Sequence, residues 1–255
     1  QRIDAVLARA GNEESYIRLI VSRGVGDISY RFERVSGPTV VVMVKPYDPL
    51  PERYYTEGID TIVSSVRRNH RQALEPAMKS GNLINNILAM QEAQAKGAVE
   101  PILLNQQGDV AEGAGSNVFV VKHRGLLTPP LGAGILAAVT PELVLEIARE
   151  LQIRAREETL RAADLVSADE VFITSTLKEC CPVRAIDGRL VGPVQPGPVT
   201  LQLLSVYREH AHRPPASEQE QGDLESHAKT SKAQREEYDE ADGANSGKEL
   251  ADENA

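Results

Sequence analysis

The sequence predicts an α+β protein, because runs typical of strands and runs typical of helices both occur along its 255 residues. Apolar and β-branched residues fill positions 16–22, 39–45 and 171–175, as expected for strands. Residues 84–96, 140–152 and 199–210 have the composition and spacing of helices instead. A hydrophobic content of 41% is enough for one or two domains with their own cores.

The N-terminal part is predicted to be one helix end followed by strands. Residues 1–11 carry four apolar side chains at helical spacing. Residues 16–22 and 39–45 are strands, and the second is almost continuously apolar, so we expect it to be central in its sheet. Residues 61–66 are a further strand.

The middle of the chain continues with a helix and two strands. The helix over residues 84–96 is expected to stop at Gly97, a residue type common after helix ends. Residues 101–104 and 117–122 are predicted strands. The polar segment at 105–109 is expected to be the hairpin turn between them.

The C-terminal helices and strand are also marked in the sequence. Thr140 is suited to cap the helix over residues 140–152, and Pro141 suits its first turn. Residues 171–175 form a short buried strand, and residues 199–210 form the last helix.

A change of composition follows this helix. Residues 213–255 contain 12 acidic and 5 basic side chains, so this tail carries −7 of the net charge of −9. Few large apolar residues occur there, and such a segment cannot offset its ordering entropy by burial. We therefore predict that residues 213–255 are a disordered acidic tail.

Composition also excludes several classes of protein. No run of about 18 uncharged apolar residues is present, so we expect no membrane span, and the N-terminus lacks the features of a signal peptide. The basic residues do not cluster as nucleic-acid binding requires. Cys180 and Cys181 are adjacent, which suits neither an ordinary disulfide nor a zinc site. We expect a reduced cytoplasmic protein without a metal.

Lys79 and Glu112 are the residues with the most specific surroundings. Lys79 lies in Met78-Lys79-Ser80-Gly81-Asn82, just before a predicted helix, and Glu112 opens the glycine-rich Glu112-Gly113-Ala114-Gly115 before a predicted strand. Taken alone, each would be read as a solvated surface charge. Together and in this order the two segments resemble the class IV aminotransferases. Branched-chain and D-amino-acid aminotransferases and aminodeoxychorismate lyase belong to that family.

The resemblance extends over most of the chain and implies pyridoxal 5′-phosphate as cofactor. It continues through Tyr16-Ile17-Arg18, residues 127–130 and 138–140, residues 168–176 and residues 196–200. It implies that Lys79 forms a Schiff base with the cofactor and later moves the substrate proton. It implies that Glu112 pairs with the pyridine nitrogen and so maintains the ring as an electron acceptor.

The remaining site residues are implied in the same way. Val139 and Thr140 at a helix start, and Ser175 and Thr176 after a strand, match the family's phosphate-binding segments, where a helix N-terminus favours an anion. The alternatives are a plain N-cap and an ordinary strand end.

Tyr16 and Arg18 resemble the Tyr-x-Arg of the branched-chain enzymes, and Arg23 is a second candidate for the substrate carboxylate. Exposed arginines at a strand edge are the alternative. The Arg-x-His of the D-amino-acid enzymes does not occur in residues 24–32, which favours L-branched-chain substrates.

The resemblance implies a two-domain fold like that of D-amino-acid aminotransferase. The small N-terminal domain at residues 1–77 is truncated, since the family's first strands and a phosphate-binding arginine precede the point equivalent to Gln1. A large cofactor-binding domain at 78–212 and the tail follow. Pro141 also replaces the arginine that the family usually has there. From the truncation and this replacement we expect weak retention of the cofactor and little or no transamination by this chain alone.

The predicted function is transfer of an amino group from branched-chain L-amino acids to 2-oxoglutarate, in amino-acid biosynthesis, by a homodimer. The alternatives are aminodeoxychorismate lyase, a D-amino-acid aminotransferase, and a catalytically weak binding or assembly relic.

Overall fold

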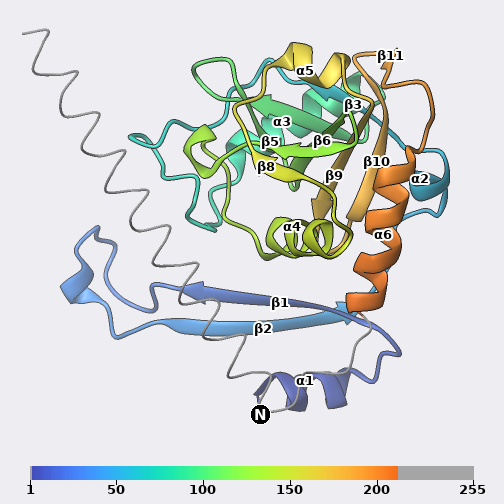
Figure 1. The fold of residues 1–255 in the computed structure, drawn as a ribbon. Coiled ribbons are helices and arrows are strands. Elements are labelled where there is room, and N and C mark those ends of the chain that lie inside the picture. Colours follow the sequence, from blue (N-terminus) through green and yellow to red (C-terminus); the bar gives the residue numbers. More distant parts are fainter. Residues whose placement is uncertain (1, 212–255) are drawn as a thin grey trace, which may run out of the picture. The chain divides into compact units, whose positions relative to one another are not determined.

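The computed structural model describes residues 2–211 and is mixed α and β (Figure 1). Its helices, the 3-10 turns included, are α1 (Arg2–Ala10), η1 (Phe32–Arg34), α2 (Arg53–Thr56), α3 (Ile84–Ala95), η2 (Leu131–Ala133), α4 (Val139–Glu150), α5 (Ala162–Val166) and α6 (Pro198–Ala211). Its strands are β1 (Ser15–Ser22), β2 (Thr39–Pro46), β3 (Ile59–Val63), β4 (Glu100–Leu104), β5 (Val110–Gly113), β6 (Asn117–Lys122), β7 (Gly125–Thr128), β8 (Ala155–Glu157), β9 (Glu170–Ser175), β10 (Glu179–Ile186) and β11 (Arg189–Leu190). The predicted α+β class is confirmed.

Nine of these strands form one mixed sheet, which we call the large sheet. Its order is β5-β4-β3-β10-β9-β6-β7-β8, with β11 paired to β10. β3 runs parallel to both β4 and β10, and β7 runs parallel to β8, whereas the other pairs are antiparallel. This sheet carries most of the buried apolar side chains among residues 2–211.

The core of the large sheet is close-packed around two stacked rings. Phe119 on β6 lies opposite Phe172 on β9, with ring centroids 5.0 Å apart. Both side chains are fully buried. Val144 and Ile147 supply the buried stripe of α4 and belong to the same core cluster. The predicted helix over residues 140–152 thus packs apolar side chains into this core.

β1 and β2 form a separate two-stranded sheet, the small sheet. They pair antiparallel from Ser15 opposite Pro46 to Ser22 opposite Thr39, and Figure 1 shows them as two long adjacent strands. The prediction that residues 39–45 lie centrally in a sheet was wrong. A continuous apolar run indicates a strand, but the neighbours of that strand are decided by the rest of the fold.

The predicted hairpin around residues 105–109 was half right. Asn105 begins a tight turn, with the Asp109 carbonyl accepting its N–H at 2.8 Å. The strand that returns is β5, not β6. β6 pairs with β7 and β9 instead. β5 is only four residues long and contains Glu112 and Gly113, so its composition did not indicate a strand.

The predicted helices at 84–96, 140–152 and 199–210 are confirmed as α3, α4 and α6. The cap of α4 was misplaced, because Ala138 is the N-cap and makes no side-chain capping hydrogen bond. Thr140 lies inside the first turn with a buried side chain.

The predicted division into domains stays a prediction. β3 precedes the expected boundary after Ala77 and is nevertheless a strand of the large sheet. The predicted disordered tail at 213–255 lies outside the described residues. Within residues 2–211, no helix has both the length and the apolar character needed to cross a membrane.

Candidate functional site

Lys79 lies in a short loop that leads into α3. The loop is folded on itself, because Ser80 N–H donates to the Met78 carbonyl at 2.8 Å and Leu83 N–H donates to the Gly81 carbonyl at 3.0 Å. The Lys79 side chain is exposed. Its charge acts on the buried Glu112 carboxylate, so the two predicted cofactor residues lie within electrostatic reach of each other.

The first turn of α3 connects the lysine loop to two other segments. Asn86 Nδ2 donates to the Ala114 carbonyl at 2.7 Å, two residues after Glu112. Asn85 Nδ2 donates to the Arg67 carbonyl at 2.8 Å, one residue before Arg68. Both asparagines follow Lys79 in the same sequence block. They hold the start of α3 against the segments that carry Glu112 and Arg68.

Glu112 is a buried carboxylate on β5, with 5% of the residue exposed. Arg68 Nε lies 2.8 Å from Glu112 Oε1. Its N–H is not aligned with that oxygen, so the contact is an ion pair without a well-directed hydrogen bond. Leu136 N–H donates to Oε2 at 2.9 Å. Since each carboxylate oxygen has two lone pairs, Glu112 retains capacity for a further donor.

Burial dominates the electrostatics of Glu112. Desolvation raises the pKa of the Glu112 carboxyl, while the Arg68 charge, the Leu136 N–H and the Lys79 charge lower it. In such surroundings an added positive partner strongly stabilises the ionised carboxylate, because the local dielectric is low and water is excluded. The site is therefore suited to a cationic N–H group.

The start of α4 lies close in the chain to Leu136, which contacts Glu112. Val139 opens this twelve-residue helix, and its side chain is 79% exposed. The N–H groups of the first turn of a helix have no partners within the helix, so they attract an anion. The Thr140 side chain is buried and hydrogen-bonds the phenol of Tyr207. At this end of α4, where Pro141 has no backbone N–H, the N–H groups of the other residues are better suited to an anion than the Thr140 hydroxyl.

Ser175 and Thr176 lie at the C-terminal end of the strand β9. Ser175 is half-buried and is the last residue of β9, and its Oγ accepts the Lys178 N–H at 3.2 Å. Thr176 is exposed. The neighbouring Thr174 pairs with Asn117 on β6, four residues after Gly113. The turn after β9 is thus next to the turn after Glu112.

The three predicted substrate residues lie on or beside the small sheet. Tyr16 and Arg18 share one face of β1, with Lys45 and Met43 directly opposite them on β2. Arg23 follows β1, and its Nη2 donates to the Ser29 carbonyl at 2.7 Å. Their part in substrate binding stays a prediction.

Arg68 was not among the residues predicted from the sequence. It is the second residue after the predicted strand at 61–66, and it belongs to a pair of consecutive arginines. A charged residue at the end of a buried strand is a recognisable signal for a site. No feature of the sequence indicated that Glu112, 44 positions later by the numbering, would be its partner.

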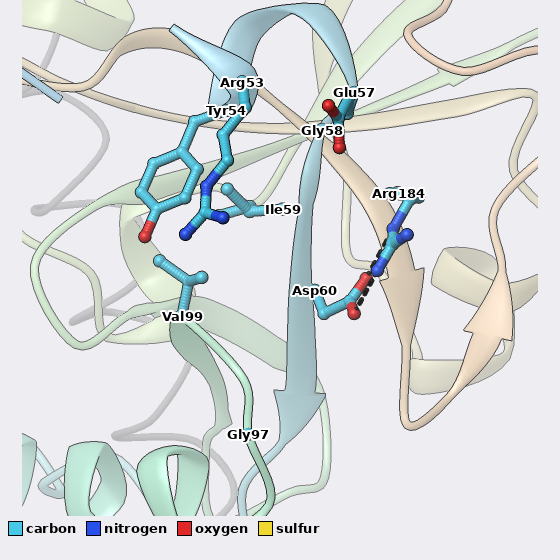
Figure 2. A pocket seen from close by; sticks show the side chains of 9 residues that line it. All are labelled: Arg53, Tyr54, Glu57, Gly58, Ile59, Asp60, Gly97, Val99 and Arg184. Carbon is cyan, nitrogen blue, oxygen red and sulfur yellow. Dashed lines mark hydrogen bonds and ion pairs between the residues drawn. The ribbon is translucent and has the colours of Figure 1, made fainter. Parts of the chain in front are cut away.

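A hollow of about 170 Å³ lies elsewhere, where α2 and β3 meet β10 (Figure 2). Arg184 and Asp60 face each other across two hydrogen bonds in it, with Arg184 Nε 2.9 Å from Asp60 Oδ1. Its lining residues include none of the predicted site residues. The guanidinium of Arg184 is already satisfied by Asp60, so the hollow offers little chemistry.

A comparison with protein families places residues 1–186 in the family described as amino-transferase class IV. The chain belongs to this family. The lysine and the buried carboxylate described above lie in the matched region.

Curated relatives and solved structures agree with this assignment. The chain is 40% identical over 212 residues to the "Putative branched-chain-amino-acid aminotransferase" of Methanocaldococcus jannaschii, covering 82% of this chain and 73% of that protein. It is 35% identical over 206 residues to the branched-chain-amino-acid aminotransferase of Salmonella typhimurium, covering 79% of this chain and 66% of the relative.

Among solved structures, the T.th. branched-chain amino acid aminotransferase with pyridoxamine 5′-phosphate is similar, with a TM-score of 0.77 and 32% identity. The match covers 83% of this chain and 70% of that structure. The fold of the family is therefore present over most of the described chain.

Proposed function

We propose that this chain is a pyridoxal 5′-phosphate-dependent aminotransferase that moves an amino group from branched-chain L-amino acids to 2-oxoglutarate. The observation that carries the proposal is the buried Glu112 carboxylate, paired with Arg68 and within reach of the Lys79 charge. The names of the similar proteins support the substrate class.

The residues present fit pyridoxal 5′-phosphate. The cofactor needs an amine for its aldehyde, an anionic partner for its ring nitrogen and donors for its phosphate. Lys79, Glu112 and the first turn of α4 supply these three groups, and the last two are linked through Leu136. When bound, the cofactor supplies an electron sink for the carbanion formed at the substrate α-carbon.

Lys79 has two tasks in this proposal. Its Nζ attaches the cofactor covalently, and in its free amine form it takes the proton from the substrate α-carbon. The exposed position of Lys79 ahead of α3 leaves its long side chain room to alternate between these tasks. The hydrogen bonds of Asn85 and Asn86 fix the start of the helix that follows.

Glu112 and Arg68 act as one unit. Arg68 favours the ionised form of Glu112 against the desolvation that opposes it. The ionised Glu112 then holds a proton on the ring nitrogen of the cofactor by charge pairing. Without Arg68, the carboxyl would more readily take the proton itself, and the ring would lose its positive charge.

The phosphate is assigned to the Val139 end of α4 and to Ser175 and Thr176. Thr140 contributes its backbone there, since its hydroxyl contacts Tyr207. Tyr16 and Arg18, with Arg23, are assigned to the substrate, whose carboxylate an arginine can bind through two hydrogen bonds. We further propose a homodimer located in the cytoplasm.

The test starts from the purified chain loaded with pyridoxal 5′-phosphate. After borohydride reduction, peptide mapping should find the pyridoxyl group on Lys79. Lys79→Arg, which preserves the charge, should abolish both attachment and turnover, whereas Lys96→Ala should preserve them. A pyridoxyl group on Lys96 or Lys122 would refute the assignment.

The substrate class is tested by turnover. With 2-oxoglutarate as acceptor, L-leucine should react faster than D-alanine. A preference for D-alanine would indicate a D-amino-acid aminotransferase, and pyruvate release from aminodeoxychorismate would indicate the lyase.

A further inference from the structure

Glu100 is a buried carboxylate to which the proposed function gives no task. It is the first residue of β4, and its side chain is 1% exposed. A buried carboxylate is costly unless its charge is paired and its lone pairs are satisfied. The hydrogen bonds and the ion pair of Glu100 therefore show which segments its side chain connects.

Both oxygens of Glu100 are occupied by two different turns. Oε1 accepts the Gly115 N–H and the Ser116 hydroxyl, each at 2.8 Å. Oε2 lies 3.1 Å from Lys178 Nζ, which also donates to the Gly115 carbonyl at 3.4 Å. The Lys178 side chain is only 21% exposed, so solvent weakens this ion pair less than it would a surface pair.

The first of these turns directly follows Glu112. It is closed by a hydrogen bond of 2.7 Å from Gly113 N–H to the Ser116 carbonyl. A Cβ at position 113 would lie 2.8 Å from Glu100 Oε1 and even nearer to Ser116 Oγ, so only glycine fits against the carboxylate. This close approach leaves the turn little freedom to move relative to β4.

The second turn carries Ser175 and Thr176. Lys178 lies in it, and its N–H donates to both the carbonyl and the hydroxyl of Ser175 at 3.2 Å. The pair of Glu100 and Lys178 therefore connects the turn after Glu112 to the turn after β9. In the proposed function, these turns hold opposite ends of one cofactor, the ring nitrogen and the phosphate.

We infer that Glu100 and Lys178 are positioning residues that set the distance between the ring-nitrogen partner and the phosphate-binding turn. The inference rests on the proposed function, because it takes Glu112 and the Ser175 turn as cofactor contacts. A rigid ligand that contacts two protein sites at once binds more tightly when the distance between those sites is already fixed in the free protein. A loosened link should thus weaken a ligand that uses both ends more than one that uses the ring alone.

The experiment compares pyridoxal 5′-phosphate with pyridoxal, which lacks the phosphate, in the full chain. Dissociation constants come from the visible absorbance of the lysine adduct. In Glu100→Gln, we expect the affinity for pyridoxal 5′-phosphate to fall about tenfold and that for pyridoxal to fall less than about threefold. Lys178→Met should change the ratio of the two affinities in the same direction. Because Lys178 is partly exposed, this variant decides the question if Glu100→Gln does not fold.

Glu170→Gln is the matched control. Glu170 on β9 is also a buried carboxylate, and it accepts hydrogen bonds from Val199 N–H and from the N–H and hydroxyl of Thr200. The variant should lower the melting temperature without changing the ratio of the two affinities.

Two results would overturn the inference: an unchanged ratio in the folded Glu100 or Lys178 variant, or an equal change in Glu170→Gln. A wild-type chain that forms no adduct would refute the proposed function itself, and the inference with it.

Discussion

The two sheets contain strands of similar sequence, but their apolar side chains differ in how far they are buried. In the large sheet, Val118, Phe119 and Val120 of β6 are completely buried. In the small sheet, Val40 and Val41 of β2 are 51% and 41% exposed. β-branched residues favour the extended backbone in both places. Burial depends instead on how many layers of structure cover each face, so strand propensity and core membership are separate properties.

The sheets also differ in the chemistry assigned to them. The large sheet holds Glu112 on β5 and Ser175 at the end of β9, and the side chain of each accepts a partly buried hydrogen bond. The small sheet carries Tyr16 and Arg18 on one face. A change in the large sheet should therefore affect stability and cofactor together, whereas a change in the small sheet should affect substrate alone.

The largest effect is expected at the centre of the large sheet. Phe172→Ala removes a fully buried ring stacked on Phe119 and leaves a cavity. The expected loss is about 4 kcal/mol in the free energy of unfolding. Urea denaturation measures it. Phe172→Leu should cost less than half as much, and equal losses for both would mean that the cavity is not the cause.

Breaking the buried ion pair should come next. Arg68→Met leaves the buried Glu112 carboxyl without its cation, which costs about 3 kcal/mol. Adding Glu112→Gln should recover part of this loss, because neither charge is then left alone. Urea denaturation of the two single variants and the double variant measures the coupling.

The same variant should change the dependence of stability on pH. Burial raises the pKa of Glu112, so the folded chain holds this proton more tightly than the unfolded chain does. The stability that Glu112 contributes is thus present at low pH and is lost as pH rises through its folded pKa. Removing Arg68 raises that pKa further. Arg68→Met should therefore cost more at pH 8 than at pH 5, and a loss equal at both would contradict the pairing.

In the small sheet, Arg18→Gln should change substrate binding without changing stability. The loss of a charge-assisted hydrogen bond should raise KM for 2-oxoglutarate by about tenfold to hundredfold, with the melting temperature unchanged. Steady-state kinetics and thermal melting test both parts. Arg34→Gln, at an exposed arginine between the same two strands, is the control. An unchanged KM would remove Arg18 from the site.

A smaller effect is expected where α3 meets the end of β3. Hydrogen bonds from Lys96 and Ser64 lower the pKa of Glu92 from 4.5 to about 2. Its contribution, about 1 kcal/mol at neutral pH, is therefore present above pH 4.5 and is lost as pH falls towards 2. Glu92→Gln should flatten the stability curve in that window. Glu146→Gln, an exposed glutamate on α4, should leave the curve as in the wild type.

The smallest effect is expected at Leu19 in the small sheet. Its side chain is 56% exposed, and Leu19→Thr introduces another good strand former. The free energy of unfolding should change by no more than about 0.5 kcal/mol. A loss above about 1 kcal/mol would show that this strand is covered in solution, and the contrast between the sheets would then disappear.

The sequence by itself predicted the local elements and indicated the family. The spacing of apolar residues placed α3, α4 and α6 within a few residues, because a helix with one buried face repeats at a fixed period. The segments around Lys79 and Glu112 indicated the family, since a lysine before a helix and an acid before a strand occur there in a fixed order. Neither conclusion needed contacts between distant residues.

Only the tertiary structure decided which strands are neighbours and which charges meet. β2 was expected in the middle of a sheet but forms a two-stranded sheet with β1. The strand that pairs with β4 after the turn is β5, not β6. The partners of Glu112 and Glu100, namely Arg68 and Lys178, lie far from them in sequence. Local propensity cannot specify such pairs, because strand order and buried ion pairs depend on how the whole chain closes around its core.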